Sequence, residues 1–285
     1  MVTVFTPTYN RAAYLLKVFE SLLQQTFKDF EWVIVDDGSI DDTSVIIDNL
    51  QLTNDKFFPI RYFYQENGGK HRAINRGVKE AKGELFLILD SDDMLPPNSL
   101  ERIDFYYQQI KDNNSFGGVC GYMAHHDGTV IGKGCDIDVL DTSSIDLRYK
   151  YHVEGDMLEV FRTSVLKEIP FPEISKEKFV PEALVWNRIA RKYKLRVFHE
   201  VVYFRDYLEG GLTDKIVKIR MNSPIASMMT YAEMTEFNIP FFAKVKAAIN
   251  YWRFRFCSDA NEKPQIEWWW LWTAPLGWMM HLRDK

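Results

Sequence analysis

The chain reads LFLILDSDD over residues 85–93, where five apolar residues lead into four polar ones, three of them aspartates. A short run that is apolar at every position is typical of a strand covered on both faces of its sheet. The stretch WVIVDDGS over residues 32–39 repeats this pattern of an apolar run closed by acidic residues. Runs at 2–5 and 60–64 predict two further strands.

Amphipathic stretches separate these four runs. Apolar residues recur there at helical spacing, and we expect helices over 15–23, over a stretch that ends near Leu50, over 71–81 and over 98–110. Strands that alternate with helices favour a parallel sheet with helices on both faces. The sequence therefore predicts a doubly wound α/β sheet.

The second half of the chain has a less regular pattern. Glycines and aspartates at turn positions from 115 to about 150 favour an antiparallel extension of the sheet. A helix over 183–192 and a strand over 195–198 are expected next, and the pattern is helical from 215 to 256.

The composition excludes a disordered chain, because 46% of the 285 residues are hydrophobic. The net charge of −5, from 35 Lys and Arg against 40 Asp and Glu, argues against a protein that binds nucleic acid. Cys120, Cys135 and Cys257 show no metal-ligand spacing, so we expect neither a disulfide framework nor a zinc site, and a reducing cytosol. No signal peptide and no apolar run of about 18 residues is visible, so a membrane-spanning helix is not expected.

Polar clusters follow all four predicted strands, at residues 6–10, 36–39, 65–71 and 90–93. The carboxyl ends of parallel strands share one edge of the sheet, and doubly wound sheets bind their ligands there. No P-loop and no Gly-x-Gly-x-x-Gly sequence follows the first strand, which argues against a P-loop NTPase and a dinucleotide dehydrogenase. We therefore expect a ligand site of another kind in these loops.

The acidic cluster of Asp90, Asp92 and Asp93 has two interpretations. Like charges at one strand end raise one another's pKa unless a cation neutralises them, and hard carboxylate oxygens suit Mg²⁺ or Mn²⁺. The other interpretation is a solubilising turn that caps the next helix. With Asp36 and Asp37 after the second strand, the acidic pairs match neither a phosphoaspartate receiver domain nor a phosphatase well.

Four motifs occur together and in order: VFTPTYNR over 4–11, VDDGS over 35–39, NGG over 67–69 and LDSDD over 89–93. In order and spacing they resemble the nucleotide-sugar domain of family 2 glycosyltransferases, over residues 2 to about 210. The resemblance implies an enzyme with the GT-A fold, in which two abutting Rossmann-like halves share a mostly parallel sheet. It also implies that the first half binds a nucleoside diphosphate sugar and the second half binds the acceptor.

The resemblance further implies roles for particular residues. Those implied for the donor line the base pocket, accept a hydrogen bond from the base, or face the ribose and phosphates; they are Pro7, Tyr9, Asp36, Asp37, Asn67, Lys70, Asp90 and Ser91. Asp92, together with Asp90, is implied to ligate a Mn²⁺ or Mg²⁺ ion that bridges the diphosphate. Lys70 is the implied phosphate cation.

An inverting transfer needs a base that takes the proton of the acceptor hydroxyl. In the family this base is commonly the aspartate of a Glu-Asp pair at a helix start, but here Glu182 is followed by Ala183. We expect Glu182 to be the base, with Asp156 as an alternative and an inactive protein as another. A purely structural Glu182 would be a first-turn carboxylate that the helix dipole favours.

The C-terminal region combines basic and aromatic residues. Residues 241–256 contain four Lys or Arg and no acidic residue, and WWWLW follows at 268–272. Pro275 and Gly277 are expected to interrupt any long helix there. This pattern is typical of an anchor at a membrane surface, and equally of an aromatic tail packed on its own domain or on a partner subunit.

The expected protein is a metal-dependent, inverting glycosyltransferase with a GT-A domain over 1–212 and a helical extension over 213–285. It would transfer a sugar from a nucleoside diphosphate donor, with UDP favoured, to a hydroxyl of a glycan or lipid-linked acceptor. We expect it in bacterial surface polysaccharide synthesis, in the cytoplasm or peripherally on the inner face of the plasma membrane. The contrasting interpretation is an inactive scaffold that binds sugar nucleotides or glycans, and Ala183 motivates it.

Overall fold

The structure is a computed structural model that describes residues 1–54, 57–134, 137–205, 215–259 and 263–285. Cys135 and the expected domain boundary at 212 lie outside the described residues. Contacts divide the chain into two compact units. The first comprises Met1–Pro170 and Asn187–Asp206, and the second comprises Phe171–Trp186 and Tyr207–Lys285.

The first unit begins with the predicted parallel strands. They are β1 (Val2–Thr8), β2 (Phe30–Asp36), β3 (Ile60–Tyr64) and β4 (Leu85–Ile88), paired in the order β3-β2-β1-β4. Thr8 pairs with Asp36, and Asp36 pairs with Tyr64, so three of the strands end at one level. This register confirms the expected edge at which the loops gather.

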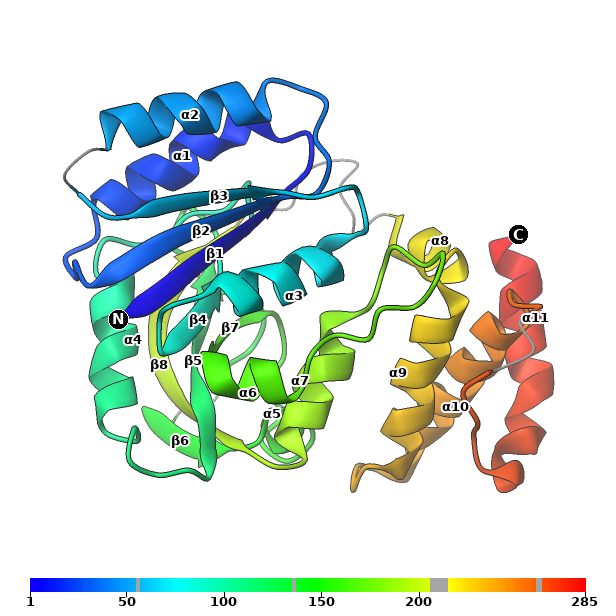
Figure 1. Cartoon of the computed structure of the whole chain (residues 1–285). Helices are drawn as coiled ribbons and strands as arrows, with labels where there is room; N and C mark the ends of the chain where they lie inside the picture. The colour runs from blue at the N-terminus through cyan, green and yellow to red at the C-terminus, as the bar shows by residue number, and fades with distance from the viewer. Residues whose placement is uncertain (55–56, 135–136, 206–214, 260–262) are drawn as a thin grey trace. The chain divides into compact units, whose positions relative to one another are not determined.

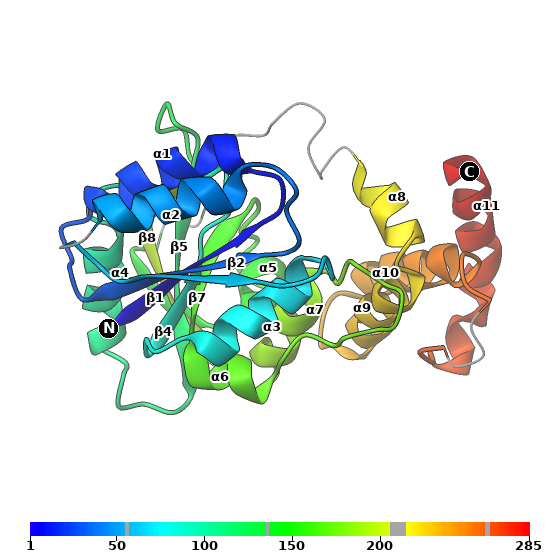
Figure 2. The same ribbon diagram turned by 45° about the horizontal axis from the view of Figure 1, so that its top comes forward.

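Helices cover both faces of these strands, as predicted. They are α1 (Ala12–Leu23), α2 (Thr43–Thr53), α3 (Lys70–Glu80) and α4 (Ser99–Gln108). Figure 1 and Figure 2 show α1 and α2 on one face of the sheet and α3 on the other. The doubly wound α/β architecture is therefore confirmed.

The rest of the first unit extends the same sheet to eight strands, in the order β3-β2-β1-β4-β7-β5-β8-β6. The added strands are β5 (Phe116–Ala124), β6 (Val139–Thr142), β7 (Met157–Arg162) and β8 (Lys194–Phe204), and the added helices are α5 (Ser144–Tyr149) and α6 (Thr163–Glu168). The helix α7 (Glu182–Ala190) is divided between the two units, which meet in the chain at Trp186 and Asn187. The sequence did not predict β7, and β8 continues six residues beyond the expected strand end at 198.

The antiparallel extension expected over 115–150 is only partly correct. β5 pairs antiparallel with β7 and β6 pairs antiparallel with β8, but β5 and β8 are parallel. A local turn pattern does not encode which distant strand becomes the neighbour, so the pairing could not be inferred from this segment alone.

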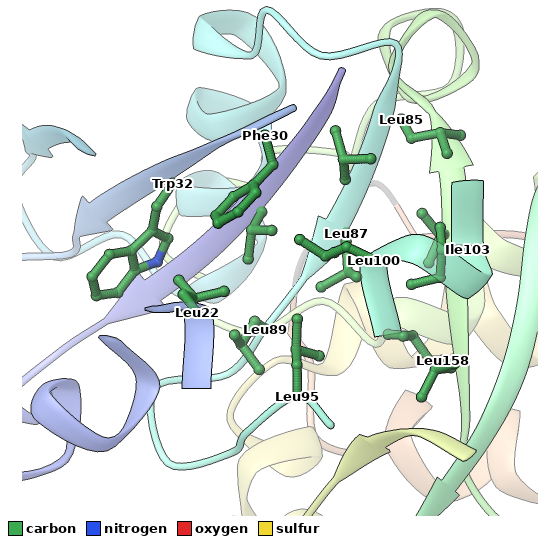
Figure 3. Packing of buried hydrophobic residues seen from close by; sticks show 14 of the residues in the cluster. Leu22, Phe30, Trp32, Leu85, Leu87, Leu89, Leu95, Leu100, Ile103 and Leu158 are labelled. Atoms are coloured by element: carbon green, nitrogen blue, oxygen red, sulfur yellow. The ribbon is translucent and has the colours of Figure 1, made fainter. Parts of the chain in front are cut away.

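The core of the first unit fills the space between the sheet and its helices. Leu22 of α1, Trp32 of β2, Leu87 of β4 and Leu100 of α4 are fully buried in one cluster (Figure 3). The indole N–H of Trp32 donates to Thr6 Oγ1 at 2.9 Å, which satisfies its only polar group inside the core. The core thereby fixes the strands whose ends carry the site.

The second unit is helical and has a small core of its own. Its helices are α8 (Ile216–Met221), α9 (Pro224–Glu236), α10 (Phe241–Arg255), the 3₁₀ helix η2 (Trp268–Thr273) and α11 (Ala274–Asp284). Met228 and Ala232 of α9 pack with Tyr251 and Phe254 of α10. No helix among the described residues is both long enough and apolar enough to cross a membrane.

One expectation for this unit is confirmed and another is corrected. Residues 215–256 are mainly helical, as expected, and form three helices, because Pro224 lies in the first turn of α9 and Pro240 precedes α10. Pro275 and Gly277 do not interrupt α11. Pro275 lies in its first turn, where no backbone N–H is needed, and Gly277 remains helical while lying against Trp252.

Gly77 provides a test of the packing of α3 on β1. A Cβ atom added at Gly77 would lie 2.3 Å from the ring of the buried Phe5. We expect Gly77→Ala to lower the free energy of unfolding by about 1–3 kcal/mol, because the extra methyl overpacks this contact. Urea unfolding, with the exposed Lys79→Ala on the same helix as control, measures the change. A gain in stability, as an open helical glycine would give, would contradict this packing.

Candidate functional site

The site is built from the loops after β1, β2, β3 and β4, all within the first unit. The loops after β1 and β2 are joined to each other. The Asn10 N–H donates to Ser39 Oγ at 2.8 Å, and the Ile40 N–H donates to Asn10 Oδ1 at 2.9 Å. Asn10 has a φ of 52°, a left-handed conformation that asparagine tolerates better than most residues.

The buried carboxylate of Asp37 organises the loop after β3. It accepts the backbone N–H groups of Gly68 at 2.9 Å and Gly69 at 2.7 Å, and the side-chain amide of Gln65 at 2.8 Å. The Asn67 amide donates to the Asp37 carbonyl at 2.8 Å. Asp37 therefore holds the glycine loop in place, in addition to the implied contact with the base, which remains a prediction.

Asp36 is also buried and has donors of its own. Its Oδ1 accepts the Ser39 N–H at 2.7 Å, and its Oδ2 accepts the Tyr62 hydroxyl at 3.0 Å. Burial and then the hydrogen bond to Asp36 raise the pKa of Tyr62, so the phenol is the donor in this pair. Asp36 thus shapes the turn after β2 from within.

Lys70 and Asp90 form an ion pair at this edge of the sheet. Lys70 is the first residue of α3, and its Nζ lies 2.7 Å from Asp90 Oδ1, with both side chains about one third exposed. The two residues come from the loops after β3 and β4. The structure brings together the implied phosphate cation and one implied metal ligand, each of which neutralises the other.

Tyr203 of β8 forms hydrogen bonds with the loop after β4. The Asp90 N–H donates to Tyr203 Oη at 3.0 Å, and Tyr203 Oη donates to Asp93 Oδ2 at 2.7 Å. Burial, and then the charge of Asp90, raise the pKa of the Asp93 carboxyl to about 7. Sequence reasoning missed Tyr203, because it lies five residues beyond the expected end of its strand and 110 residues from Asp93.

Asp92, the other implied metal ligand of this loop, is also part-exposed. It is 26% exposed, and Arg11 Nη2 lies 3.8 Å from its Oδ2, a long ion pair. The described residues contain no group of three or more His, Cys, Asp or Glu side chains that could hold a metal ion. Mg²⁺ needs only one or two protein carboxylates when substrate phosphates and water complete its shell, so Asp92 and Asp90 are chemically suited to such an ion.

The remaining implied donor residues lie around the same loops. Tyr9 is half exposed after β1, Pro7 is the next-to-last residue of that strand, and Ser91 is buried beside Asp90. Their contacts with a donor remain predictions.

The candidate bases lie in different units. Glu182 is the first residue of α7 and belongs to the second unit, and Ala183 beside it is exposed. Asp156 belongs to the first unit, where Arg205 Nη1 lies 2.7 Å from its Oδ2. Asp156 is therefore already paired with a cation, and the assignment of Glu182 remains a prediction.

Comparison with known proteins identifies the family. Residues 3–125 match the model of a family described as glycosyl transferase family 2. A GalNAc(5)-diNAcBac-PP-undecaprenol beta-1,3-glucosyltransferase of Campylobacter jejuni is 32% identical over 213 residues, which are 72% of this chain and 64% of that protein. The chain spans less than two thirds of the length of the first relatives that it matches.

Solved structures share the fold. Staphylococcus aureus TarS has a TM-score of 0.62 and 21% identity, over 91% of this chain and 44% of TarS, and TarS has also been crystallised with UDP-GlcNAc. The mannosyltransferase PcManGT from Pyrobaculum calidifontis, in complex with GDP-Man and Mn²⁺, has a TM-score of 0.59 and 17% identity, over 98% of this chain and 73% of that one. These likenesses confirm the expected GT-A fold. With four family motifs gathered at one edge of the sheet, the chain belongs to glycosyl transferase family 2, a family of enzymes that transfer sugars.

Proposed function

We propose that the protein transfers a sugar from a UDP-sugar to a hydroxyl of a glycan or lipid-linked acceptor, with inversion at the anomeric carbon. The observation that carries this proposal is the meeting of the Asp37-held glycine loop, Lys70 and the acidic loop after β4 at one sheet edge. Two similarities support the choice of substrates. TarS structures contain UDP and UDP-GlcNAc, and the name of the Campylobacter jejuni relative includes a lipid-linked acceptor.

Lys70 would stabilise the leaving diphosphate. The diphosphate leaving group gathers negative charge as the bond to the sugar breaks, and a positioned cation stabilises that charge. Lys70 Nζ faces Asp90 in this structure, and an arriving diphosphate competes with Asp90 for it. If the Lys70 ammonium paired with the phosphate instead, the Asp90 carboxylate would become available to bind a cation.

Asp92 and Asp90 would hold a divalent ion, Mn²⁺ or Mg²⁺. When bound, such an ion supplies Lewis-acid stabilisation of the diphosphate. The hard oxygen donors of the two aspartates suit it, and the PcManGT complex contains Mn²⁺. Tyr203 keeps the loop in position by bonding Asp90 and Asp93 at once.

Glu182 would take the proton of the acceptor hydroxyl as that oxygen attacks the anomeric carbon. Its place at the first residue of α7 supports this role, because the family's base commonly lies at a helix start in the second half of the fold. The second candidate function is a scaffold that binds donor without transferring sugar, which Ala183 favours. Release of free sugar from the donor in the presence of Mn²⁺ distinguishes the two, because a scaffold binds without releasing it.

The proposed setting is bacterial surface polysaccharide synthesis, with the protein in the cytoplasm and peripheral on the inner face of the plasma membrane. The basic and aromatic C-terminal region supports this setting, since such sequences bind at membrane surfaces.

Asp92→Asn tests the metal role. A neutral amide is a poor ligand for a hard cation, so we expect sugar transfer to fall on the order of 10²-fold or more and Mn²⁺-dependent donor binding to weaken. The melting temperature should not change, because the side chain is part-exposed. Asp112→Asn, at an exposed position away from the loop, is the matched control. Full transfer by Asp92→Asn would remove the metal role.

Glu182→Gln tests the base. The amide keeps the shape of the side chain but lacks basicity, so transfer should fall by about 10² to 10⁴-fold while donor affinity stays unchanged. Single-turnover kinetics measure the chemical step separately from product release. In the same assay Ala183→Asp should bring no gain if Glu182 is the base. A gain in transfer from Ala183→Asp, or an undiminished rate in Glu182→Gln, would mean that Glu182 is not the base.

Tyr203→Phe tests the support of the acidic loop. Removal of the hydroxyl leaves the buried Asp93 carboxyl and the Asp90 N–H without this partner, so we expect the Mn²⁺ concentration for half-maximal activity to rise. Tyr107→Phe is the matched control, because Tyr107 is equally buried and its hydroxyl donates to Glu84, away from the loop. Equal losses of stability in both variants with no change in Mn²⁺ dependence would mean that Tyr203 is only structural.

A further inference from the structure

The last helices of the chain expose many apolar side chains. Residues 268–282 read WWWLWTAPLGWMMHL and contain no Asp, Glu, Lys or Arg. A surface helix of a soluble protein normally turns polar residues outward. Here the outward side chains are apolar, so the outward face needs an explanation.

The inward face packs on α10. Its residues recur every three or four positions and are buried: Trp270, Thr273, Gly277 and His281. A Cβ atom on Gly277 would lie 2.4 Å from Trp252 Cβ, and the Trp252 indole donates to the Trp270 carbonyl at 3.2 Å. Figure 1 shows α11 beside α10 in this arrangement. The packing fixes which side chains face outward.

The outward side chains are exposed aromatic and aliphatic residues. Trp268 is 80% exposed, Leu271 62% and Met279 58%. The set also includes Trp269, Trp272, Leu276, Trp278, Met280 and Leu282. Phe241, at the start of α10, stacks on Trp270 with ring centroids 5.9 Å apart, so exposed Phe241 and Phe242 adjoin the same surface. We call these exposed side chains the tail surface.

The charge of the region selects the partner. Residues 215–285 contain ten Lys and Arg against six Asp and Glu, while the whole chain has a net charge of −5. Two copies meeting through this surface would bring like charges together, whereas an anionic lipid surface attracts them. Tryptophan and basic residues together favour the headgroup region, and the stretch is too short to cross a hydrocarbon core of about 30 Å.

We infer that the tail surface inserts into the headgroup region of an anionic lipid bilayer, with Trp268, Trp269 and Trp272 as its principal contacts. The inference deepens the proposed membrane setting and rests on it, but it does not depend on sugar transfer. The helix η2 and α11 lie in the plane of the interface, held by α10, and the basic residues of the same unit contact the lipid phosphates.

The test is sedimentation of the full chain with vesicles, without a sugar donor. We expect binding to vesicles of equal parts phosphatidylcholine and phosphatidylglycerol, and weaker binding to phosphatidylcholine alone, because each Lys or Arg near an anionic surface strengthens binding by about fivefold. The combined variant Trp268→Ser, Trp269→Ser and Trp272→Ser should lower binding on the order of 100-fold, since three large apolar side chains no longer leave water. Leu52→Ser, at a 79% exposed position on α2, is the control and should bind normally.

The outcomes separate the alternatives. The three tryptophans are exposed, so the combined variant should keep its melting temperature and its thermal shift with UDP-sugar. Equal vesicle binding by the variant and the original chain would overturn the inference. The inference would also be overturned if the original chain did not bind vesicles and eluted as a dimer, while the variant eluted as a monomer. The tail surface would then join two copies. Loss of sugar transfer with intact vesicle binding would count against the proposed enzyme alone.

Discussion

Buried carboxylates have to be supplied with hydrogen-bond donors, and this constraint shapes the candidate site. Asp37 lies at the end of a core strand and is 4% exposed, so an unpaired charge there would be strongly unfavourable. Its donors include the backbone N–H groups of Gly68 and Gly69, and Gly69 has a φ of 98°, which favours glycine. The loop after β3 is therefore folded around Asp37, and α3 begins where that loop ends. Lys70 owes its position to this arrangement.

The same constraint operates on the loop after β4. Asp93 is buried, and its donor is the hydroxyl of Tyr203, which comes from the second half of the sheet. That hydroxyl also accepts the N–H of Asp90, so one phenol sets the course of the acidic loop. A side chain on β8 thus couples the two halves of the GT-A fold at the site, next to the backbone bridge between Met94 and Phe204. Through this contact the second half of the sheet supports the loop that carries the proposed metal ligands.

Charge at the open edge is balanced in pairs. Lys70 faces Asp90, Arg11 faces Asp92, and Arg205 faces Asp156. A diphosphate and a divalent ion would bring opposite charges into the same space, so their binding would exchange partners within existing pairs. Such an exchange would cost little, because the pairs are part-exposed and part-exposed ion pairs are weak.

The sequence by itself determined the alternating strands and helices of the first half, the loops that carry the acidic motifs and the family. These features are local: apolar runs, helical spacing and short motifs each lie within a few adjacent residues. The sequence also indicated an unusual aromatic tail, but it did not reveal which side chains face outward.

Only the tertiary structure decided the partners that come from distant parts of the chain. The parallel pairing of β5 with β8 and the bond from Tyr203 to Asp93 depend on strand order and register, which local patterns do not specify. Trp252 of a neighbouring helix lies so close to Gly277 that a Cβ atom would not fit there, a contact that the tail sequence does not show. The physical reason is the same in each case: a side chain's role follows from its neighbours in space, and the sheet and helix packing choose those neighbours.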